Sequence, residues 1–230
     1  MSRRCENCGS RPPLGRFKWC KRCIRVWQRS HRRGFYEERV DADHTYVRAP
    51  QDTCDLAAQI PTLYHGAVLE NLPEGLVQVY RELPEYKGLY LWGEPGRGKT
   101  YAMAAITKDL WARGYDVTRI TYEWLMLHIR DSFKPGSGHS EQDAITPYIE
   151  TDALVVEDVG TTASEKETDF SMRTFFVLLD TRLEWMRPTF ITSNRTPEQL
   201  GEQFNNRIES RLMAACQAAR VAGPDWRKQQ

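Results

Sequence analysis

The segment from Gly93 to Thr100 reads GEPGRGKT and fits the phosphate-binding loop pattern G-x-x-x-x-G-K-T. The apolar residues 89–92 before it predict a strand, and the helix-forming residues 101–111 after it predict a helix, as this loop requires. Glycines let successive backbone N–H groups converge on phosphate oxygens, and the helix start adds positive potential. A glycine-rich turn without a ligand is the alternative, but the flanking strand and helix favour nucleotide binding.

The loop also carries side chains suited to a triphosphate. Lys99 is expected to reach the β- and γ-phosphates, and Thr100 supplies a hydroxyl where such loops ligate magnesium. The chemistry of the loop therefore favours a nucleoside triphosphate with Mg²⁺ over an isolated phosphate as the ligand. The predicted nucleotide-binding residues are Gly93, Glu94, Pro95, Gly96, Arg97, Gly98, Lys99, Thr100 and Tyr101.

Two adjacent acids, Glu157 and Asp158, follow the apolar run 153–156, which is typical of a strand buried on both faces of a parallel sheet. Acids at the end of a buried strand are unfavourable unless they meet a cation or water. After a phosphate loop they indicate Walker B chemistry, in which Glu157 organises magnesium and its neighbour orients the water that attacks the γ-phosphate. A strand that ends in acids at the surface is the alternative.

Four cysteines near the start of the chain form two C-x-x-C pairs, Cys5 with Cys8 and Cys20 with Cys23. Two such pairs can close a tetrahedral shell of four thiolates around Zn²⁺, which is typical of a structural site. So short a segment cannot bury enough core to fold unaided, so the metal would supply folding energy. Redox pairs or free thiols are the alternatives, and Cys54 lies outside this spacing.

The charge distribution is uneven. Residues 1–40 hold twelve Lys or Arg and three acids, whereas the rest of the chain holds 20 basic and 28 acidic residues. The basic end favours an acidic partner, either nucleic acid or a protein surface, although a solvated basic face is the alternative. Without a membrane-length apolar run or an apolar signal region, the 230-residue chain is expected to be a soluble cytoplasmic protein.

Alternating strand and helix patterns predict an α/β domain with a central parallel sheet, flanked by helices, whose ligands bind at the carboxyl ends of the strands. The expected strands are 88–92, 116–121, 153–156 and 188–194. The expected helices are 73–83, 101–113, 122–133, 141–150, 170–186, 197–204 and 205–216. We divide the chain into a zinc-binding basic module (1–45), a linker (46–59) and an ATPase domain (60–230).

Taken together, these motifs resemble the AAA+ ATPases of the DnaC- and DnaI-type replicative helicase loaders and the related IstB-type transposition ATPases. The resemblance rests on residues 60–71, 93–100, 154–160, 192–194, 206–212 and 223–227. It implies that Asn194 is the sensor-1 residue, Arg211 the arginine finger and Arg227 the sensor-2 residue. The chain ends three residues after Arg227, so no helical lid is expected. The family usually has Asp at the position of Glu157, and this difference affects the expected magnesium geometry and hydrolysis rate.

The zinc-bearing start resembles phage- or plasmid-type members, in which the appended domain grips the hexameric helicase and the ATPase domain assembles on single-stranded DNA as a ring or spiral. The leading hypothesis is therefore an ATP-dependent loader of a replicative helicase, and an IstB-type ATPase that recruits a transposase is the alternative. A metabolic P-loop kinase is disfavoured because a lid and a substrate-pocket signature are missing. A zinc-dependent DNA-binding regulator with a vestigial ATP site is a further reading. For Arg211, the alternative to a finger is a surface salt bridge within 205–216.

Overall fold

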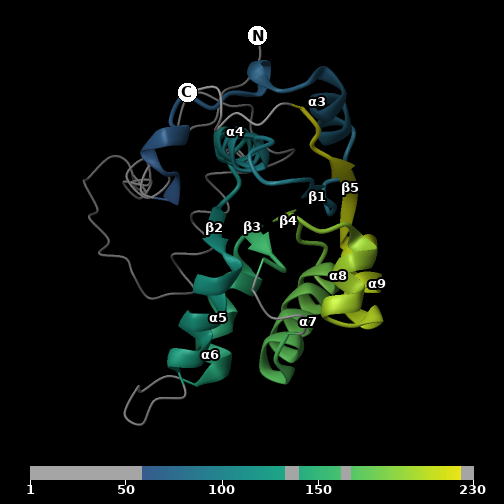
Figure 1. Ribbon diagram of the computed structural model, residues 1–230. Coiled ribbons are helices and arrows are strands. Elements are labelled where there is room, and N and C mark those ends of the chain that lie inside the picture. Colours follow the sequence, from purple (N-terminus) through teal and green to yellow (C-terminus); the bar gives the residue numbers. More distant parts are fainter. Residues whose placement is uncertain (1–58, 133–139, 162–166, 224–230) are drawn as a thin grey trace, which may run out of the picture.

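The computed structural model describes residues 59–132, 140–161 and 167–223 (Figure 1). The predicted zinc module, nearly all of the linker, and Arg227 lie outside these ranges. Within them, no helix is both long enough and apolar enough to cross a membrane.

The described domain is built on one sheet of five parallel strands in the order β2-β3-β4-β1-β5. The strands are β1 (Gly88–Trp92), β2 (Val117–Thr121), β3 (Ala153–Val159), β4 (Thr189–Ser193) and β5 (Cys216–Arg220). Because all the strands are parallel, their carboxyl ends meet at one edge, where α/β proteins bind their ligands. We call this edge the carboxyl edge of the sheet and the opposite one the amino edge.

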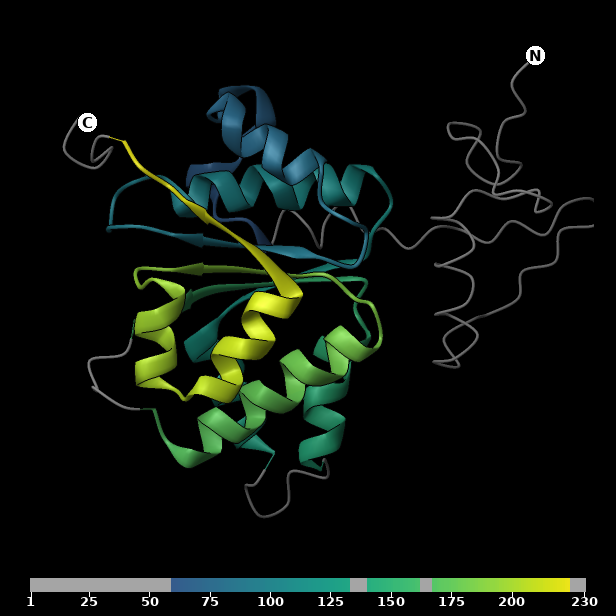
Figure 2. The same ribbon diagram turned by 90° about the vertical axis from the view of Figure 1, so that its right-hand side faces the viewer.

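Helices cover both faces of the sheet. Figure 2 shows α3 and α4 above one face, and α7, α8 and α9 below the other. The helices are α3 (Glu74–Arg81), α4 (Lys99–Ala112), α5 (Tyr122–Asp131), α6 (Glu141–Glu150), α7 (Asp169–Glu184), α8 (Pro197–Gln203) and α9 (Asn206–Ala215), with short 3-10 turns at Thr62–Tyr64 and Leu69–Asn71. Two apolar layers result, one on each face.

Strand β3 shows how the two layers are divided. Leu154 and Val156 belong to the cluster that includes residues of α5, α7 and α9, whereas Ala153 and Val155 belong to the cluster that includes α4. All four residues are fully buried. Successive side chains of a strand point to opposite faces, so a strand covered on both sides needs an uninterrupted apolar sequence. The expected run 153–156 is therefore confirmed as a central strand.

Two features differ from the sequence expectations. The expected helix 205–216 ends at Ala215, and Cys216 instead begins β5, which pairs with β1 along its whole length. The β5 sequence CQAAR contains no β-branched or aromatic residue, so its local preference does not predict a strand, and the pairing with β1 decides its conformation. Strand β3 also continues beyond Val156 to Val159, with a shift of register against β4.

Candidate nucleotide-binding site

The expected phosphate loop joins β1 to α4 at the carboxyl edge of the sheet. Gly93, Gly96 and Gly98 all have positive φ values, of 153°, 80° and 88°, which glycine adopts more readily than residues with a Cβ atom. A Cβ atom on Gly93 would lie 2.4 Å from the carbonyl oxygen of Val221, so the segment after β5 passes close to the loop. A side chain at Gly93 is therefore excluded by the backbone of Val221, and the left-handed conformation favours glycine at Gly96 and Gly98.

Lys99 connects the loop to the end of β4. Its side chain is 6% exposed, and Nζ donates to the carbonyl oxygens of Gly93 (2.7 Å) and Glu94 (2.9 Å). Nζ also donates to Oδ1 of Asn194 at 2.7 Å. The structure thus brings together two predicted site residues that lie far apart in the sequence, Lys99 and Asn194, through a direct hydrogen bond.

Other loop residues tie the loop to its surroundings. The Arg97 guanidinium pairs with the Glu94 carboxylate and donates to the carbonyl oxygen of Gly223. Hydrogen bonding to Arg97, and its charge, lower the pKa of the exposed Glu94 carboxyl. Pro95 is exposed between these residues, at the outer side of the loop.

Tyr101 lies on the first turn of α4 and faces the segment that precedes α3. Its hydroxyl accepts from Asn71 Nδ2 at 3.0 Å and donates to the Gly66 carbonyl at 3.4 Å. The side chain also packs against the small apolar cluster that contains Ile60 and Ala67. Tyr101 therefore fixes the start of the described chain against the helix that follows the loop.

The acid pair is split by a bulge in β3. Val156 pairs with Ile191 and Val159 with Ser193, so β3 has one more residue than β4 between these two pairs. Asp158 takes up the difference with a left-handed φ of 57°, and its side chain is exposed. Such bulges redirect a side chain and are frequent next to functional sites.

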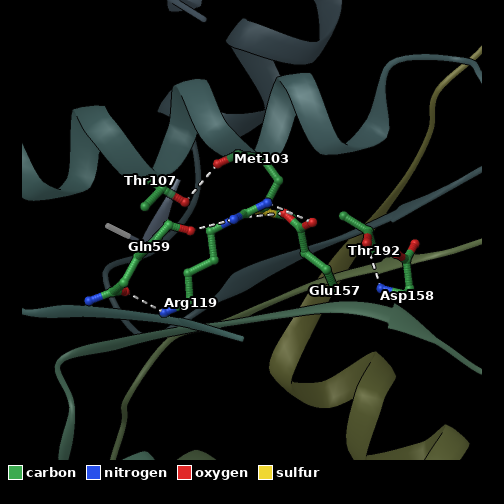
Figure 3. Close-up of polar contacts among 7 residues, drawn as sticks. All are labelled: Gln59, Met103, Thr107, Arg119, Glu157, Asp158 and Thr192. Atoms are coloured by element: carbon green, nitrogen blue, oxygen red, sulfur yellow. Dashed lines mark hydrogen bonds and ion pairs between the residues drawn. The ribbon is translucent and has the colours of Figure 1, made fainter. Parts of the chain in front are cut away.

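Two hydroxyls hold the backbone at Asp158. Its N–H donates to the buried Thr192 Oγ1 on β4 at 2.9 Å, and its carbonyl accepts from Thr161 Oγ1 at 2.8 Å. Figure 3 shows Asp158 and Thr192 together at the end of the strand, with Glu157 turned the other way.

Glu157 forms a buried ion pair with Arg119 on β2. Arg119 Nε donates to Oε1 at 2.9 Å and Nη2 donates to Oε2 at 2.8 Å, and the side chains are 9% (Arg119) and 3% (Glu157) exposed. Gln59 completes the arrangement, because its Oε1 accepts from the Arg119 backbone N–H at 2.8 Å and its carbonyl from Nη1 at 2.5 Å (Figure 3). Burial raises the pKa of Glu157 to about 7, although the Arg119 charge opposes this shift.

Magnesium is implied by the phosphate loop, and the predicted ligands fit it unequally. Thr100 is half-buried in the first turn of α4, where its hydroxyl suits a magnesium ligand. Both carboxylate oxygens of Glu157 accept from Arg119, so the geometry of this residue does not fit an open magnesium ligand. Among the residues that the structure describes, no group of three or more His, Cys, Asp or Glu could hold a metal ion.

The predicted finger, Arg211, lies on α9, in the layer on the far side of the sheet from α4 (Figure 2). Its Nε contacts Asp180 Oδ1 of α7 at 2.6 Å, and its side chain is 44% exposed. Arg211 and Arg207 both stack near Phe176, with guanidinium-to-centroid distances of 5.9 and 4.6 Å. The structure thus places Arg211 apart from the loop of its own chain, and its ion-pair partner lies outside the range 205–216.

Two residues of this site were not expected from the sequence, Arg119 and Gln59. A signal for Arg119 is present, because it has the same parity in β2 as the buried Val117 and therefore points toward α4. A buried arginine needs hydrogen-bond acceptors, and a carboxylate with the matching parity in the next strand, Glu157, can supply two. No comparable pattern marks Gln59. The predicted zinc ligands, Cys5, Cys8, Cys20 and Cys23, and Arg227 lie outside the described residues and stay predictions.

Comparison with known families settles the class of the domain. Residues 77–219, more than half of the chain, match the bacterial DnaA ATPase domain. The chain belongs to this family. It is an AAA+ ATPase related to DnaA and to the DnaC and DnaI helicase loaders, and this membership supports ATP hydrolysis.

Two curated relatives carry the name replicative helicase loader. DnaC of Escherichia coli K12 is 29% identical over 120 residues, which are 52% of this chain and 47% of DnaC. DnaI of Bacillus subtilis 168 is 27% identical over 126 residues, which are 54% of this chain and 39% of DnaI. The match therefore spans about half the length of these relatives or less.

Solved structures support the same fold. A crystal structure of the DnaC helicase loader matches with a TM-score of 0.62 and 18% identity, over 70% of this chain and 100% of that one. A structure of the replication initiator DnaA bound to AMPPCP and single-stranded DNA matches with a TM-score of 0.60 and 21% identity, over 71% and 52% of the two chains. The described domain is thus an α/β AAA+ domain with a five-stranded parallel sheet.

Proposed function

We propose that this protein is an ATP-binding and ATP-hydrolysing helicase loader that delivers a replicative DNA helicase onto single-stranded DNA during replication initiation. The observation that carries the proposal is the contact between Lys99 and Asn194, which brings the phosphate loop and the end of β4 together at the carboxyl edge. The Lys99 ammonium lies at the phosphate loop, where such a cation meets the β- and γ-phosphates of ATP. The names of the curated relatives supply the biological context, since both are replicative helicase loaders.

Two observations support single-stranded DNA as a ligand, namely a structural neighbour and the positive charge of residues 1–40. The replication initiator DnaA was solved with AMPPCP and single-stranded DNA, and its fold matches this domain. The basic residues 1–40 add a sequence-independent attraction for phosphates, which weakens as salt rises. We assign these residues to a zinc-bound module, within 1–45, that grips the helicase, and residues 60–230 to the ATPase domain. This organisation is that of a phage- or plasmid-type loader.

Arg211 is proposed to act on the nucleotide of a neighbouring copy. It is partly exposed on α9, and its guanidinium is the permanently charged, forked group that pairs with developing phosphoryl charge. A homo-oligomeric ring or spiral would bring the α9 side of one copy to the carboxyl edge of the next. In that arrangement the Asp180 pair holds the side chain until assembly.

The test uses the full chain with a purified hexameric replicative helicase, Mg-ATP and circular single-stranded DNA. A loader forms an isolable complex with the helicase and raises the fraction of helicase bound to the circle, and both effects need ATP and residues 1–45. The deletion of residues 1–45 should keep ATP turnover while helicase association is lost. ATP-dependent binding to duplex DNA with no helicase association would contradict the proposal and favour the IstB-type transposition ATPase.

A further inference from the structure

The two acids of the predicted Walker B pair differ in almost every physical property. Glu157 is 3% exposed, and both of its carboxylate oxygens accept hydrogen bonds from one guanidinium group. Asp158 is exposed and lies on the bulge that ends β3. Two carboxylates in such different surroundings are suited to different tasks.

The ion pair with Arg119 disfavours binding of a divalent cation to Glu157. The guanidinium already neutralises the carboxylate through two parallel charge-assisted hydrogen bonds, the strongest pairing geometry available to arginine. A second cation at the same carboxylate would face the positive charge of Arg119 at short range in a buried setting, where Coulomb repulsion is weakly screened. The pair also occupies the sheet face covered by α4, beneath Met103 and Thr107 (Figure 3).

The bulge explains why the Asp158 side chain is exposed and not buried in the core. Leu154 and Val156 point into the apolar layer formed with α5 and α7, and regular alternation would send Asp158 into the same layer. The extra residue and the left-handed backbone turn Asp158 out to the carboxyl edge instead. Its direction depends on two anchors, the Thr192 hydroxyl on its backbone N–H and the neighbouring Glu157 side chain held by Arg119.

We propose that the acid pair of this chain is divided by Arg119, so that Asp158 is the carboxylate that acts on the nucleotide and Glu157 is an anchor. Arg119 is then a positioning residue for hydrolysis, since it holds Glu157 and thereby fixes the bulge that presents Asp158. Gln59 supports Arg119 from the start of the described chain through two hydrogen bonds. This inference rests on the proposed ATPase function and changes the predicted assignment of Glu157 as the magnesium ligand.

The first experiment replaces both charges, because a buried ion pair exchanged as a unit for apolar side chains leaves no unpaired charge. Arg119→Met and Glu157→Met are made singly and together in the full chain. Each single variant should lower the thermal midpoint, and the double variant should recover most of the loss. The matched control is the exposed pair between Arg173 and Glu141, with side chains 64% and 33% exposed, where the same changes should leave the midpoint unchanged.

The second measurement addresses the nucleotide. Binding of a fluorescent ATP analogue is titrated with and without Mg²⁺, and turnover is measured as kcat and KM. The Arg119→Met/Glu157→Met variant should keep the wild-type ratio of affinities with and without Mg²⁺ within about twofold, while kcat falls about tenfold at unchanged KM because the bulge is less well anchored. Asp158→Asn should lower kcat at least about 100-fold with an unchanged midpoint, as expected for removal of a general base.

Two results would overturn the division of the acids. Loss of the Mg²⁺ dependence of ATP binding in the double variant would make Glu157 a magnesium ligand, and an unchanged kcat would make the pair a scaffold element without a positioning role. If the double variant does not fold, the Glu157→Asp variant tests whether Glu157 is an anchor or a magnesium ligand. It should lower kcat without moving the Mg²⁺ concentration for half-maximal ATP binding, and a shift of that concentration would contradict us. Absence of ATP binding in the wild type would instead overturn the proposed function, so the two failures are distinguishable.

Discussion

Arg119 and Arg182 are both buried arginines, but they belong to opposite edges of the sheet and are stabilised in different ways. Arg119 lies toward the carboxyl edge and pairs with the carboxylate of Glu157. Arg182 is fully buried near the amino edge, where β3 and β4 begin. Its guanidinium donates to neutral acceptors, the carbonyl oxygens of Tyr148, Ile149, Thr151 and Pro188 and Oγ1 of Thr189, at 2.7 to 3.0 Å.

The difference separates a scaffold from a functional edge. The acceptors of Arg182 are mostly backbone atoms at the end of α6 and the starts of two strands, so this side chain joins three elements at once. Burial lowers the pKa of Arg182 to about 9, which still leaves the group protonated at neutral pH. At the carboxyl edge the arginine instead uses an acid next to Asp158. The buried arginine at the amino edge is thus held by hydrogen bonds to neutral groups, whereas the one at the carboxyl edge is held by an ion pair.

The largest effect on stability is expected from Arg182→Met. The change leaves several buried acceptors without their donor, and it should lower the free energy of unfolding by about 3 to 5 kcal/mol. Urea unfolding measures this loss, and the exposed Arg173→Met serves as the matched control. The ATP affinity of the folded fraction should not change. A loss below about 1 kcal/mol would contradict the proposed role of Arg182 in joining the elements at the amino edge.

A somewhat smaller loss, about 2 to 4 kcal/mol at pH 8, is expected from Arg119→Met, because it leaves Glu157 buried without its cation. The loss should shrink as the pH is lowered to 5. Burial already raises the pKa of Glu157, and removal of the Arg119 charge raises it further. A carboxyl whose pKa is higher in the folded state favours folding at low pH and loses that contribution as the pH rises through the folded-state pKa.

Urea unfolding of Arg119→Met and of Arg182→Met, each at pH 8 and at pH 5, tests whether the two arginines differ in the charge of their partners. The deficit of Arg182→Met should be nearly independent of pH, since its hydrogen-bond acceptors do not titrate. Equal pH dependence of the two deficits would contradict the assignment of an ionic partner to Arg119 alone.

The smallest change in stability is expected from Arg211→Ala. Its pair with Asp180 is partly exposed, so its loss should lower the free energy of unfolding by less than about 1 kcal/mol. DNA-stimulated turnover should nevertheless fall sharply, because the proposed finger acts on a neighbouring copy. Arg207→Ala, one turn earlier and also stacked on Phe176, is the matched control and should keep its activity.

A mixing experiment tests whether Arg211 acts between copies. Lys99→Ala contributes an intact finger and Arg211→Ala an intact nucleotide pocket, so a mixture of the two should regain part of the activity. If the mixture stays inactive although the two variants fold and assemble together, the finger does not act in this way.

Much of the fold followed from the sequence because its signals are local. The run 153–156 and the pattern from Gly93 to Thr100 identify a buried strand and a phosphate loop from neighbouring residues alone. The strand at 216–220 was not predicted from the sequence, since its residues have little preference for strands and its conformation comes from pairing with β1. The contact of Lys99 with Asn194 is consistent with the roles that the family resemblance implied.

The ion pair at Glu157 illustrates what the sequence leaves open. Adjacent acids after a strand indicate a cation nearby, but they do not distinguish a metal ion from an arginine on the next strand. The parity of Arg119 and Glu157 in their strands favours the arginine only once the order of the strands is known. Similarly, the bulge at Asp158 depends on the pairing of β3 with β4, and no local sequence motif predicts that pairing.

The central claim is that the edge around Lys99 binds ATP. The most direct measurement is calorimetric titration of the full chain with Mg-ATP, comparing the wild type, Lys99→Ala and Lys87→Ala. Lys87 precedes β1 at the amino edge, so its removal changes the net charge equally without touching the loop. We predict saturable binding to the wild type and to Lys87→Ala and no detectable binding to Lys99→Ala. Because Lys99 is buried and donates three hydrogen bonds, its removal should lower the thermal midpoint, so circular dichroism at the titration temperature must show that Lys99→Ala is folded. Unchanged affinity in Lys99→Ala would contradict the central claim.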